Sequence, residues 1–358
     1  MASYLILTTA IFLLSLFEYA NNTLPNSNKD KNFHIVLYAL TLVFLIIFVG
    51  FREIGFDYDN YKSLFNKFSI FWRENSEVES IDKGYAFLNH ISPSFRFLLV
   101  SIATVTLTLI LSFFYKFSPL PFASTFFYIG AFLLTSAMGQ YRQALAMAIV
   151  LWAFALYDKK LYFTFLALCA SFFHVSAILA LSILFMPKKI CAPRTYLLFL
   201  VFAVIMNLTA GSLIMSLSNF MPSLIAYKFS FYADTQQGIV YGFNMAMLLR
   251  VIVFLLFYHN RNIISSYRHG EAFLNIYFIS LLIYMGFGFI PEIAARGSSY
   301  FYFIEFVLAG MLIGGSRKGI IYLAFFSCIS IYRLAGTLTE WSHNYIPYSN
   351  ELFSAIGL

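Results

Sequence analysis

The apolar stretch LYFTFLALCASFFHVSAILALSILFM, residues 161–186, decides how the rest of the chain is threaded. A membrane-spanning helix needs about 20 apolar residues. This stretch has 26 residues, which are too few for two full spans. They are also more than a single upright span requires. Polar side chains, Ser171, His174 and Ser176, lie near its middle. Either two short helices meet part-way across the membrane, or one long helix crosses it at a tilt.

The composition around this stretch is that of a membrane protein. Of 358 residues, 61% are hydrophobic and only 11% are charged, whereas soluble domains hold about 45–50% apolar and about 25% charged residues. Backbone groups in lipid must find their hydrogen-bond partners internally, so the spans should be helices. The apolar runs predict an all-α polytopic bundle of about 11 to 12 membrane helices, with residues 1–358 forming a single membrane domain.

The basic loops choose between the two threadings. If the joint NSNKDKN is cytoplasmic, PKKICAPR, HNRNIISSYRHGE and SRKG fall on the same side only when residues 161–186 enter the membrane and return. Loops rich in lysine and arginine favour the cytoplasm. We therefore expect a broken or re-entrant helix near 170–176, lining a cavity open to the periplasm. Long periplasmic segments are then expected at 51–95 and 219–241 and in the C-terminal tail, 335–358.

Several classes of function fit poorly. The net charge is +7, but the basic residues lie mostly in short loops, where the positive-inside rule explains them without a nucleic acid. Cys169, Cys191 and Cys328 are odd in number and scattered, which indicates neither a disulfide framework nor a zinc site. No second His or Cys stands at metal-ligand spacing from His174, so we predict no metal and no cofactor.

A dense polar cluster opens the first long outer segment. The stretch GFREIGFDYDNY, residues 50–61, carries Arg52, Asp57, Tyr58 and Tyr61 directly after an apolar run. Tyrosine rings stack on sugars, carboxylates accept hydrogen bonds from sugar hydroxyls, and guanidinium groups bind phosphate oxygens. The simpler alternative is a helix boundary with a solvated ion pair.

Other polar groups lie inside or at the ends of apolar helices. Arg142 lies at the outer start of an apolar helix, where the free N–H groups already favour anions. Arg142 could add to an anion site there, or it could be an interfacial anchor. His174 has an ordinary pKa near 6.5 and could take a proton from a hydroxyl, although a lone histidine in an apolar run is more often structural. Arg250 and Glu305 are costly within a membrane and are either functional or a mutual salt bridge. Arg296 repeats the theme of an arginine near an outer helix end.

Four motifs together resemble the EpsG-type proteins, a branch of the Wzy-like polysaccharide polymerases. GFREIGFDYDNY, YRQALAMAI, SFFHVSAILAL and ARGSSYFYF occur in this order, and the resemblance that they carry covers most of the chain. The resemblance implies a GT-C-like glycosyltransferase of the bacterial inner membrane, with its active site facing the periplasm. It would polymerise undecaprenyl-pyrophosphate-linked oligosaccharide repeats into O-antigen, capsule or exopolysaccharide. The expected partners are this lipid-linked oligosaccharide, membrane lipid and a chain-length regulator of the same pathway.

Chemistry suggests a role for each residue of the four motifs. An inverting, metal-independent transfer needs one base, for which His174 leads and Asp57 is second, and cations that stabilise the departing pyrophosphate. We assign pyrophosphate binding to Arg142 and Arg296, with Arg52 or Arg250 assisting, and sugar contacts to Tyr58, Tyr61, Gln143 and Tyr300. A transporter or flippase of lipid-linked oligosaccharide, a membrane acyltransferase that modifies periplasmic glycans, and a non-catalytic scaffold are the alternatives.

Overall fold

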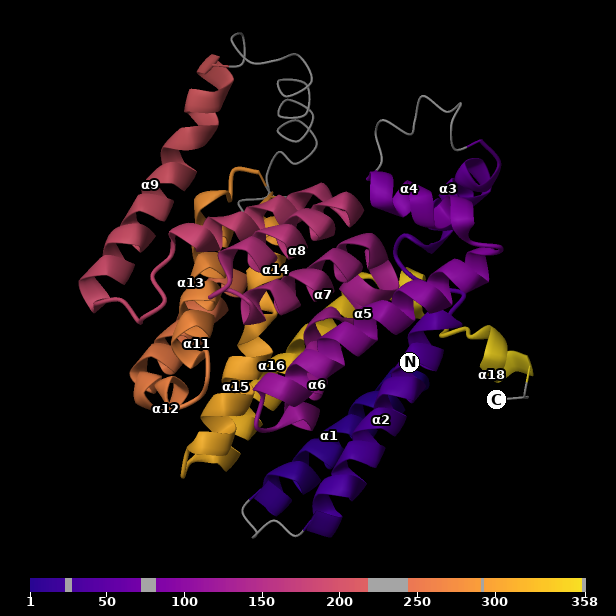
Figure 1. Cartoon of the computed structure of the whole chain (residues 1–358), viewed down its shortest axis with the longest axis horizontal. Coiled ribbons are helices and arrows are strands. Elements are labelled where there is room, and N and C mark those ends of the chain that lie inside the picture. The colour runs from indigo at the N-terminus through magenta and orange to yellow at the C-terminus, as the bar shows by residue number, and fades with distance from the viewer. Residues whose placement is uncertain (23–27, 72–81, 218–243, 291–292, 356–358) are drawn as a thin grey trace. The chain divides into compact units, whose positions relative to one another are not determined.

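The computed structural model describes residues 1–22, 28–71, 82–217, 244–290 and 293–355, and these residues form helices joined by short connections (Figure 1). The only bridge of β type in the described residues is the isolated pair Arg52 and Asn350. The all-α prediction is therefore confirmed for the described chain. The predicted outer segment 219–241 lies outside the described residues.

Six described helices are long and apolar enough to cross a membrane. They are Ala2–Asn21, Asn32–Gly50, Phe95–Phe117, Pro121–Gly139, Ile293–Gly315 and Gly319–Glu340. Six shorter apolar helices accompany them: Tyr141–Ala155, Lys160–Phe173, Val175–Phe185, Pro193–Thr209, Met245–His259 and Gly270–Gly286. The described residues thus support six candidate membrane spans, and the predicted total of 11 to 12 membrane helices stays a prediction.

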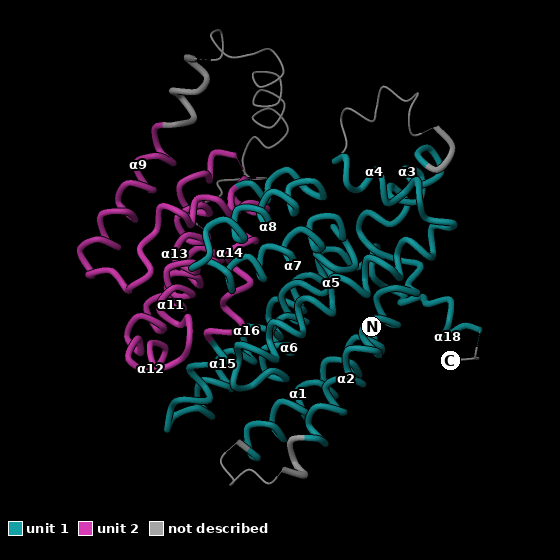
Figure 2. The backbone as a smooth tube through the Cα atoms, in the orientation of Figure 1, with its two compact units in different colours: residues 1–178, 309–358 teal, residues 179–308 magenta. Residues whose placement is uncertain are grey.

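The chain divides into two compact units (Figure 2). Unit 1 holds residues 1–178 and 309–358, and unit 2 holds residues 179–308. The single membrane domain over residues 1–358 that the sequence suggests stays a prediction.

Unit 1 contains most of the long helices. In chain order they are α1 (Ala2–Asn22), α2 (Asn28–Gly50), α3 (Tyr58–Phe71), α4 (Lys83–Ile91), α5 (Phe95–Phe117), α6 (Pro121–Tyr128), the π-helix η2 (Ile129–Gly139), α7 (Tyr141–Ala155), α8 (Lys160–Phe173), α16 (Gly319–Glu340), α17 (Ser342–Tyr345) and α18 (Glu351–Ala355). Helix α2 packs on α5, α5 on α7, and α7 on α8. Gly130 of η2 lets the backbone of α16 approach, because an added Cβ would lie 2.6 Å from the Ser330 carbonyl oxygen.

Unit 2 is built around helix α13 (Gly270–Gly286), nearly all of whose side chains are buried. Its neighbours are α9 (Pro193–Leu217), α11 (Met245–His259), α12 (Arg261–Ser265), the π-helix η5 (Ile293–Gly297) and α14 (Ser298–Tyr302). Helix α15 (Ile304–Gly315) continues from this unit into unit 1.

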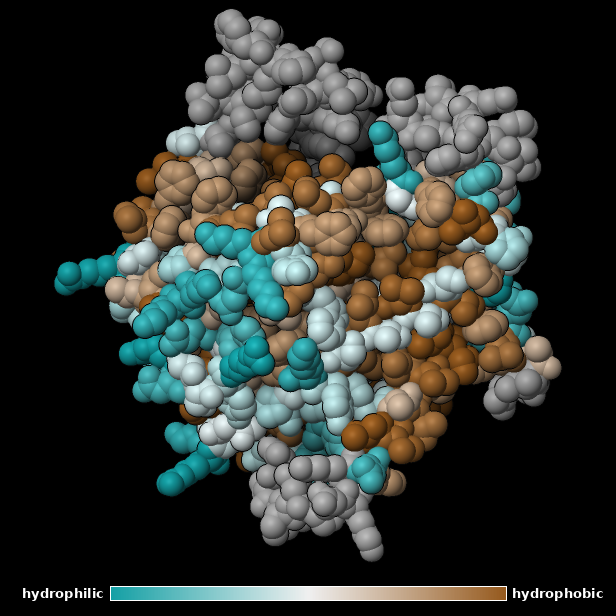
Figure 3. Space-filling model, viewed as in Figure 1, coloured by the Kyte–Doolittle hydropathy of each residue, from teal (hydrophilic) through white to brown (hydrophobic). Residues whose placement is uncertain are grey.

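Many large apolar side chains lie on the surface, as expected of helices that face lipid. Examples are Ile6 and Leu13 on α1, Val36 and Leu40 on α2, and Leu198 on α9, all about half exposed or more. Figure 3 shows extensive apolar colour on the face in view. A soluble protein rarely exposes so much apolar surface, so lipid is the natural covering for these side chains.

Helix α8 ends at Phe173, and the predicted break falls at the next residue. His174 has φ −158° and ψ 116°, an extended backbone. The 3₁₀ helix η3 (Val175–Phe185) follows at once. The broken helix predicted near 170–176 is therefore present, whereas its re-entrant course stays a prediction.

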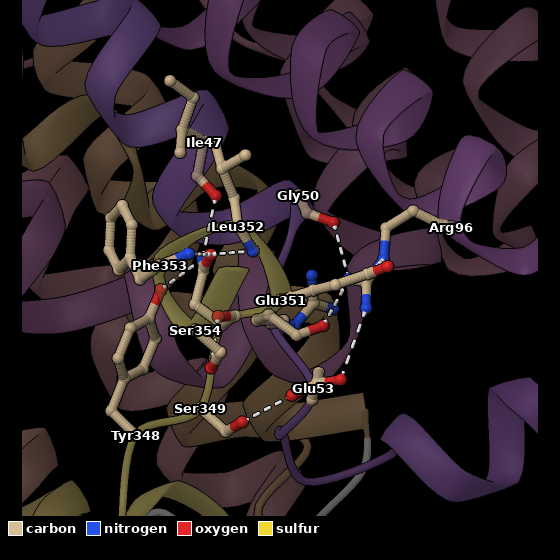
Figure 4. Close-up of polar contacts among 12 residues, drawn as sticks. Ile47, Gly50, Glu53, Arg96, Tyr348, Ser349, Glu351, Leu352, Phe353 and Ser354 are labelled. Carbon is tan, nitrogen blue, oxygen red and sulfur yellow. Dashed lines mark hydrogen bonds and ion pairs between the residues drawn. The ribbon is translucent and has the colours of Figure 1, made fainter. Parts of the chain in front are cut away.

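The C-terminal tail returns to the end of α2 in unit 1 (Figure 4). Asn350 donates through Nδ2 to the Ile47 carbonyl at 3.1 Å, and Glu53 N–H donates to the Ser349 carbonyl at 3.0 Å. Arg96 links the two chain segments of this contact. Its Nη1 donates to the Arg52 carbonyl at 2.7 Å, and its Nε forms an ion pair with Glu351 Oε2 at 2.5 Å. We call residues 345–354 the C-terminal strap.

Candidate functional site

The Arg142 guanidinium lies at the centre of a polar cluster in unit 1. Its Nη1 donates to Asp82 Oδ2 at 3.2 Å, and its Nε donates to the Tyr61 hydroxyl at 3.4 Å. The guanidinium carbon also stands 5.4 Å from the Tyr61 ring and 5.1 Å from the Tyr85 ring. The Arg142 side chain is 24% exposed, so the group is held on one side and reachable on another.

Three tyrosines form the wall behind this arginine. Tyr61 of α3, Tyr85 of α4 and Tyr141 of α7 are each less than 5% exposed and belong to one apolar cluster. The Tyr61 and Tyr141 rings are 3.9 Å apart, and the Tyr85 and Tyr141 hydroxyls share a hydrogen bond of 2.7 Å. Burial raises the pKa of Tyr85 well above its ordinary value, so its hydroxyl stays protonated and neutral beside the guanidinium.

Asp82 is a member of the cluster that sequence reasoning missed. It directly precedes α4, where an aspartate usually caps the helix, yet its side chain makes no cap bond there. Its carboxylate instead accepts from Arg142 through Oδ2 and from the Val175 backbone N–H through Oδ1 at 3.1 Å. Its sequence position before a short helix reads as an ordinary cap, and no local signal distinguishes it.

His174 lies at the break, one residue before the N–H that Asp82 accepts. Its Nδ1 is 2.6 Å from Ser176 Oγ, a hydrogen bond that fixes the plane of the ring. The residue is half-buried. The Asp82 carboxylate therefore connects the arginine on α7 with the segment that carries the predicted base.

The Arg52 side chain is buried rather than exposed to solvent. Its side chain is 1% exposed; Nη1 donates to the Val49 carbonyl at 2.6 Å and Nε to the Met138 carbonyl at 3.2 Å. These carbonyls lie in the last turns of α2 and η2, where a cation is favoured. Burial lowers the pKa of the guanidinium, though an arginine stays charged in proteins. Nη2 has no hydrogen-bond partner among the described residues.

Arg250 occupies a second polar cluster, in unit 2. Its guanidinium carbon lies 4.1 Å from the Tyr284 ring and 4.2 Å from the Tyr302 ring, and Nη1 donates to Ser298 Oγ at 2.9 Å. The Tyr277 hydroxyl donates to Glu305 Oε2 at 2.8 Å. The Tyr277 hydroxyl also lies 3.3 Å from the backbone carbonyl of Arg250. Within the described residues Arg250 makes no salt bridge with Glu305, and the tyrosine rings take the place of a carboxylate.

The remaining predicted residues are distributed as follows. Asp57 is half-buried and accepts the first backbone bond of α3, from Tyr61 N at 2.9 Å. Tyr58 is half-buried and packs edge-on against Phe95. Gln143 is 3% exposed in α7. In unit 2, Arg296 is exposed at the end of η5, and Tyr300 of α14 is fully buried.

The structure thus brings three of the predicted positions together in unit 1. Arg142 bonds Tyr61 directly, and Asp82 links Arg142 to the break at His174. Arg250, Arg296 and Tyr300 belong to unit 2. The roles assigned to all these residues stay predictions.

Six long apolar helices define a multi-pass membrane protein. A family model matches residues 35–350 and is described as the EpsG family, a family of membrane proteins linked to exopolysaccharide biosynthesis. Because the match covers most of the chain, this protein belongs to the EpsG family. No curated protein and no solved structure gave a match.

Proposed function

We propose that this EpsG-family protein is a polysaccharide polymerase, a glycosyltransferase that uses undecaprenyl-pyrophosphate-linked repeats at the periplasmic face of the inner membrane. The observation that carries the proposal is the link between Arg142 and the helix break through the Asp82 carboxylate. A cation for a pyrophosphate and a histidine for a hydroxyl proton are the two groups that such a transfer requires. Family membership supports a role in polysaccharide synthesis.

The proposed reaction is a single displacement. The hydroxyl of the acceptor repeat attacks C1 of the donor sugar, whose bond to the pyrophosphate oxygen breaks as the new glycosidic bond forms. The hydroxyl proton passes to His174, and the electron pair of the broken bond leaves with undecaprenyl pyrophosphate. Arg142 offsets the charge that develops on this leaving group. A displacement of this kind inverts the anomeric centre.

The other residues have supporting roles in the proposal. Asp57 is the second candidate for the base. Tyr58, Tyr61 and Gln143, which lie in the same unit as Arg142, make the sugar contacts. Arg142 has five N–H donors as an arginine, and Asp82 and Tyr61 engage only Nη1 and Nε. The donors that these contacts leave over would bind phosphate oxygens.

The test is to size the lipid-linked glycans of a strain that lacks this protein, by extraction and mass spectrometry. Single repeats on undecaprenyl pyrophosphate at the outer face, with the long polymer absent, would support the proposal. The same repeats trapped at the inner face would indicate a flippase instead. Polymer of normal length that lacks only a substituent would indicate an acyltransferase. Complementation with the wild-type chain must restore the polymer, and complementation with His174→Ala must not.

A further inference from the structure

We infer that Asp82 is a positioning residue, which sets the Arg142 guanidinium and the His174 break in one fixed geometry. This inference rests on the proposed function, because it gives these two groups a shared task. It adds a residue that none of the four sequence motifs contains.

The first argument is the use of the carboxylate. Its two oxygens bind two partners that are 60 and 93 residues away in the sequence, Arg142 Nη1 at 3.2 Å and Val175 N at 3.1 Å. The Asp82 side chain makes no capping hydrogen bond to α4, although it occupies the N-cap position of that helix. These two long-range bonds replace the local one. Asp82 therefore joins three separate elements, namely the start of α4, α7 and the α8–η3 break.

The second argument is the orientation of the guanidinium. An arginine side chain has several rotatable bonds, and a single contact would leave its planar head free to turn. Tyr61 holds Nε at 3.4 Å while Asp82 holds Nη1, and two contacts at different nitrogens define the plane. The Asp82 side chain is 15% exposed and that of Arg142 is 24% exposed, so water screens this pair only in part.

The third argument is the backbone at the break. The first N–H groups of a helix lack partners within that helix, and Val175 is the first residue of η3. Asp82 supplies the acceptor for this N–H. Without Asp82, the Val175 N–H would find its acceptor only if α8 continued through His174. The imidazole would then point in a different direction. Asp82 therefore acts on the base through the backbone and on the cation through a side chain.

The fourth argument is the close fit of α4 against α8. A Cβ on Gly84 would lie 2.8 Å from the Phe172 carbonyl oxygen. The absence of a side chain at position 84 thus lets the start of α4 come against the last turn of α8. This brings Asp82, two residues earlier, within reach of the break.

The test uses the full chain in lipid nanodiscs, with undecaprenyl pyrophosphate as the probe. Affinity is measured for the wild type, Asp82→Asn, Arg142→Ala and the double variant. Asp82→Asn keeps the shape but removes the charge, and Asp59→Asn, an exposed carboxylate on α3, is the matched control. We expect Asp82→Asn to bind about tenfold more weakly, as when a charge-assisted hydrogen bond no longer orients its partner. The double variant should bind no more weakly than Arg142→Ala alone.

Hydrogen exchange at residues 172–178 provides a readout that needs no ligand. Asp82→Ala should accelerate exchange of the Val175 amide at least tenfold, while Asp59→Asn should leave it unchanged. The inference is overturned if Asp82→Asn binds like the wild type. It is also overturned if Asp82→Asn weakens binding equally with and without Arg142, or if the Val175 amide exchanges at the wild-type rate. A wild type that binds no undecaprenyl pyrophosphate would refute the proposed function instead, and the exchange experiment would still decide the positioning role.

Discussion

Replacing Gly84 with alanine tests the close approach that brings the start of α4 to the helix break. The new Cβ would lie 2.8 Å from the Phe172 carbonyl oxygen, about 0.6 Å short of ordinary contact, which begins at 3.4 Å. The opposing atom is backbone, so it cannot swing away as a side chain would. Overpacking of this kind costs about 1–3 kcal/mol. Helix propensity returns up to about 1 kcal/mol for Gly→Ala.

Gly336→Ala is the matched control for this change. Gly336 lies in α16, and an added Cβ there would meet nothing within 4 Å. This variant should gain up to about 1 kcal/mol from helix propensity alone, so the difference between the two variants isolates the clash, at about 1–3 kcal/mol. Thermal unfolding of both variants in the same detergent measures this difference. Polymer length in cells should fall only for Gly84→Ala, because the displaced α4 carries Asp82 with it. Equal melting temperatures for the two variants would refute the close approach.

Further predictions concern the proposed base, the arginine of unit 2 and the C-terminal strap. His174→Ala should abolish polymer formation in membranes while leaving the melting temperature nearly unchanged; full activity would exclude this histidine as the base. Arg250→Lys should lower the free energy of unfolding by about 2 kcal/mol, because an ammonium cannot stack between two rings as a buried guanidinium does; unchanged chemical denaturation would contradict the ring sandwich. Asn350→Ala should cost about 1–3 kcal/mol, because the Ile47 carbonyl loses its buried donor, and protease should then cut the C-terminal strap faster than it does in Ser354→Ala.

The sequence allowed the helical class and the place of the break to be predicted. Composition required membrane helices, and the basic loops could share one side of the membrane only if residues 161–186 entered it and returned. The extended backbone at His174 confirms a break at the expected place, whereas the return of the segment stays a prediction. The helical class and the break could be predicted because hydrophobicity and its polar interruptions are properties of short segments, which can be read without knowing what packs on them.

The partners of the charged residues could not be predicted in the same way. Arg52 suggested a ligand site because its neighbours in sequence are polar, but its bonds go to Val49 and to Met138, 86 residues later. Asp82 belongs to none of the sequence motifs, yet its partners lie on α7 and at the break. Arg250 and Glu305 suggested a salt bridge, whereas tyrosine rings and a serine hold the arginine. Long-range pairing is set by packing, which a single sequence does not record.

The C-terminal strap has a consequence for the order in which the molecule matures. Asn350 and Ile47, which it joins, are 303 residues apart, and the Tyr4 hydroxyl donates to the Tyr345 carbonyl across 341 residues. A chain emerging from the ribosome inserts α1 and α2 long before either tail partner exists. The loop that holds Arg52 and Asp57 therefore reaches its final form only after Asn350 has been synthesised, about 300 residues later. Contacts of such high sequence separation form slowly, so the strap delays completion of this loop until the other helices of its unit are in the membrane.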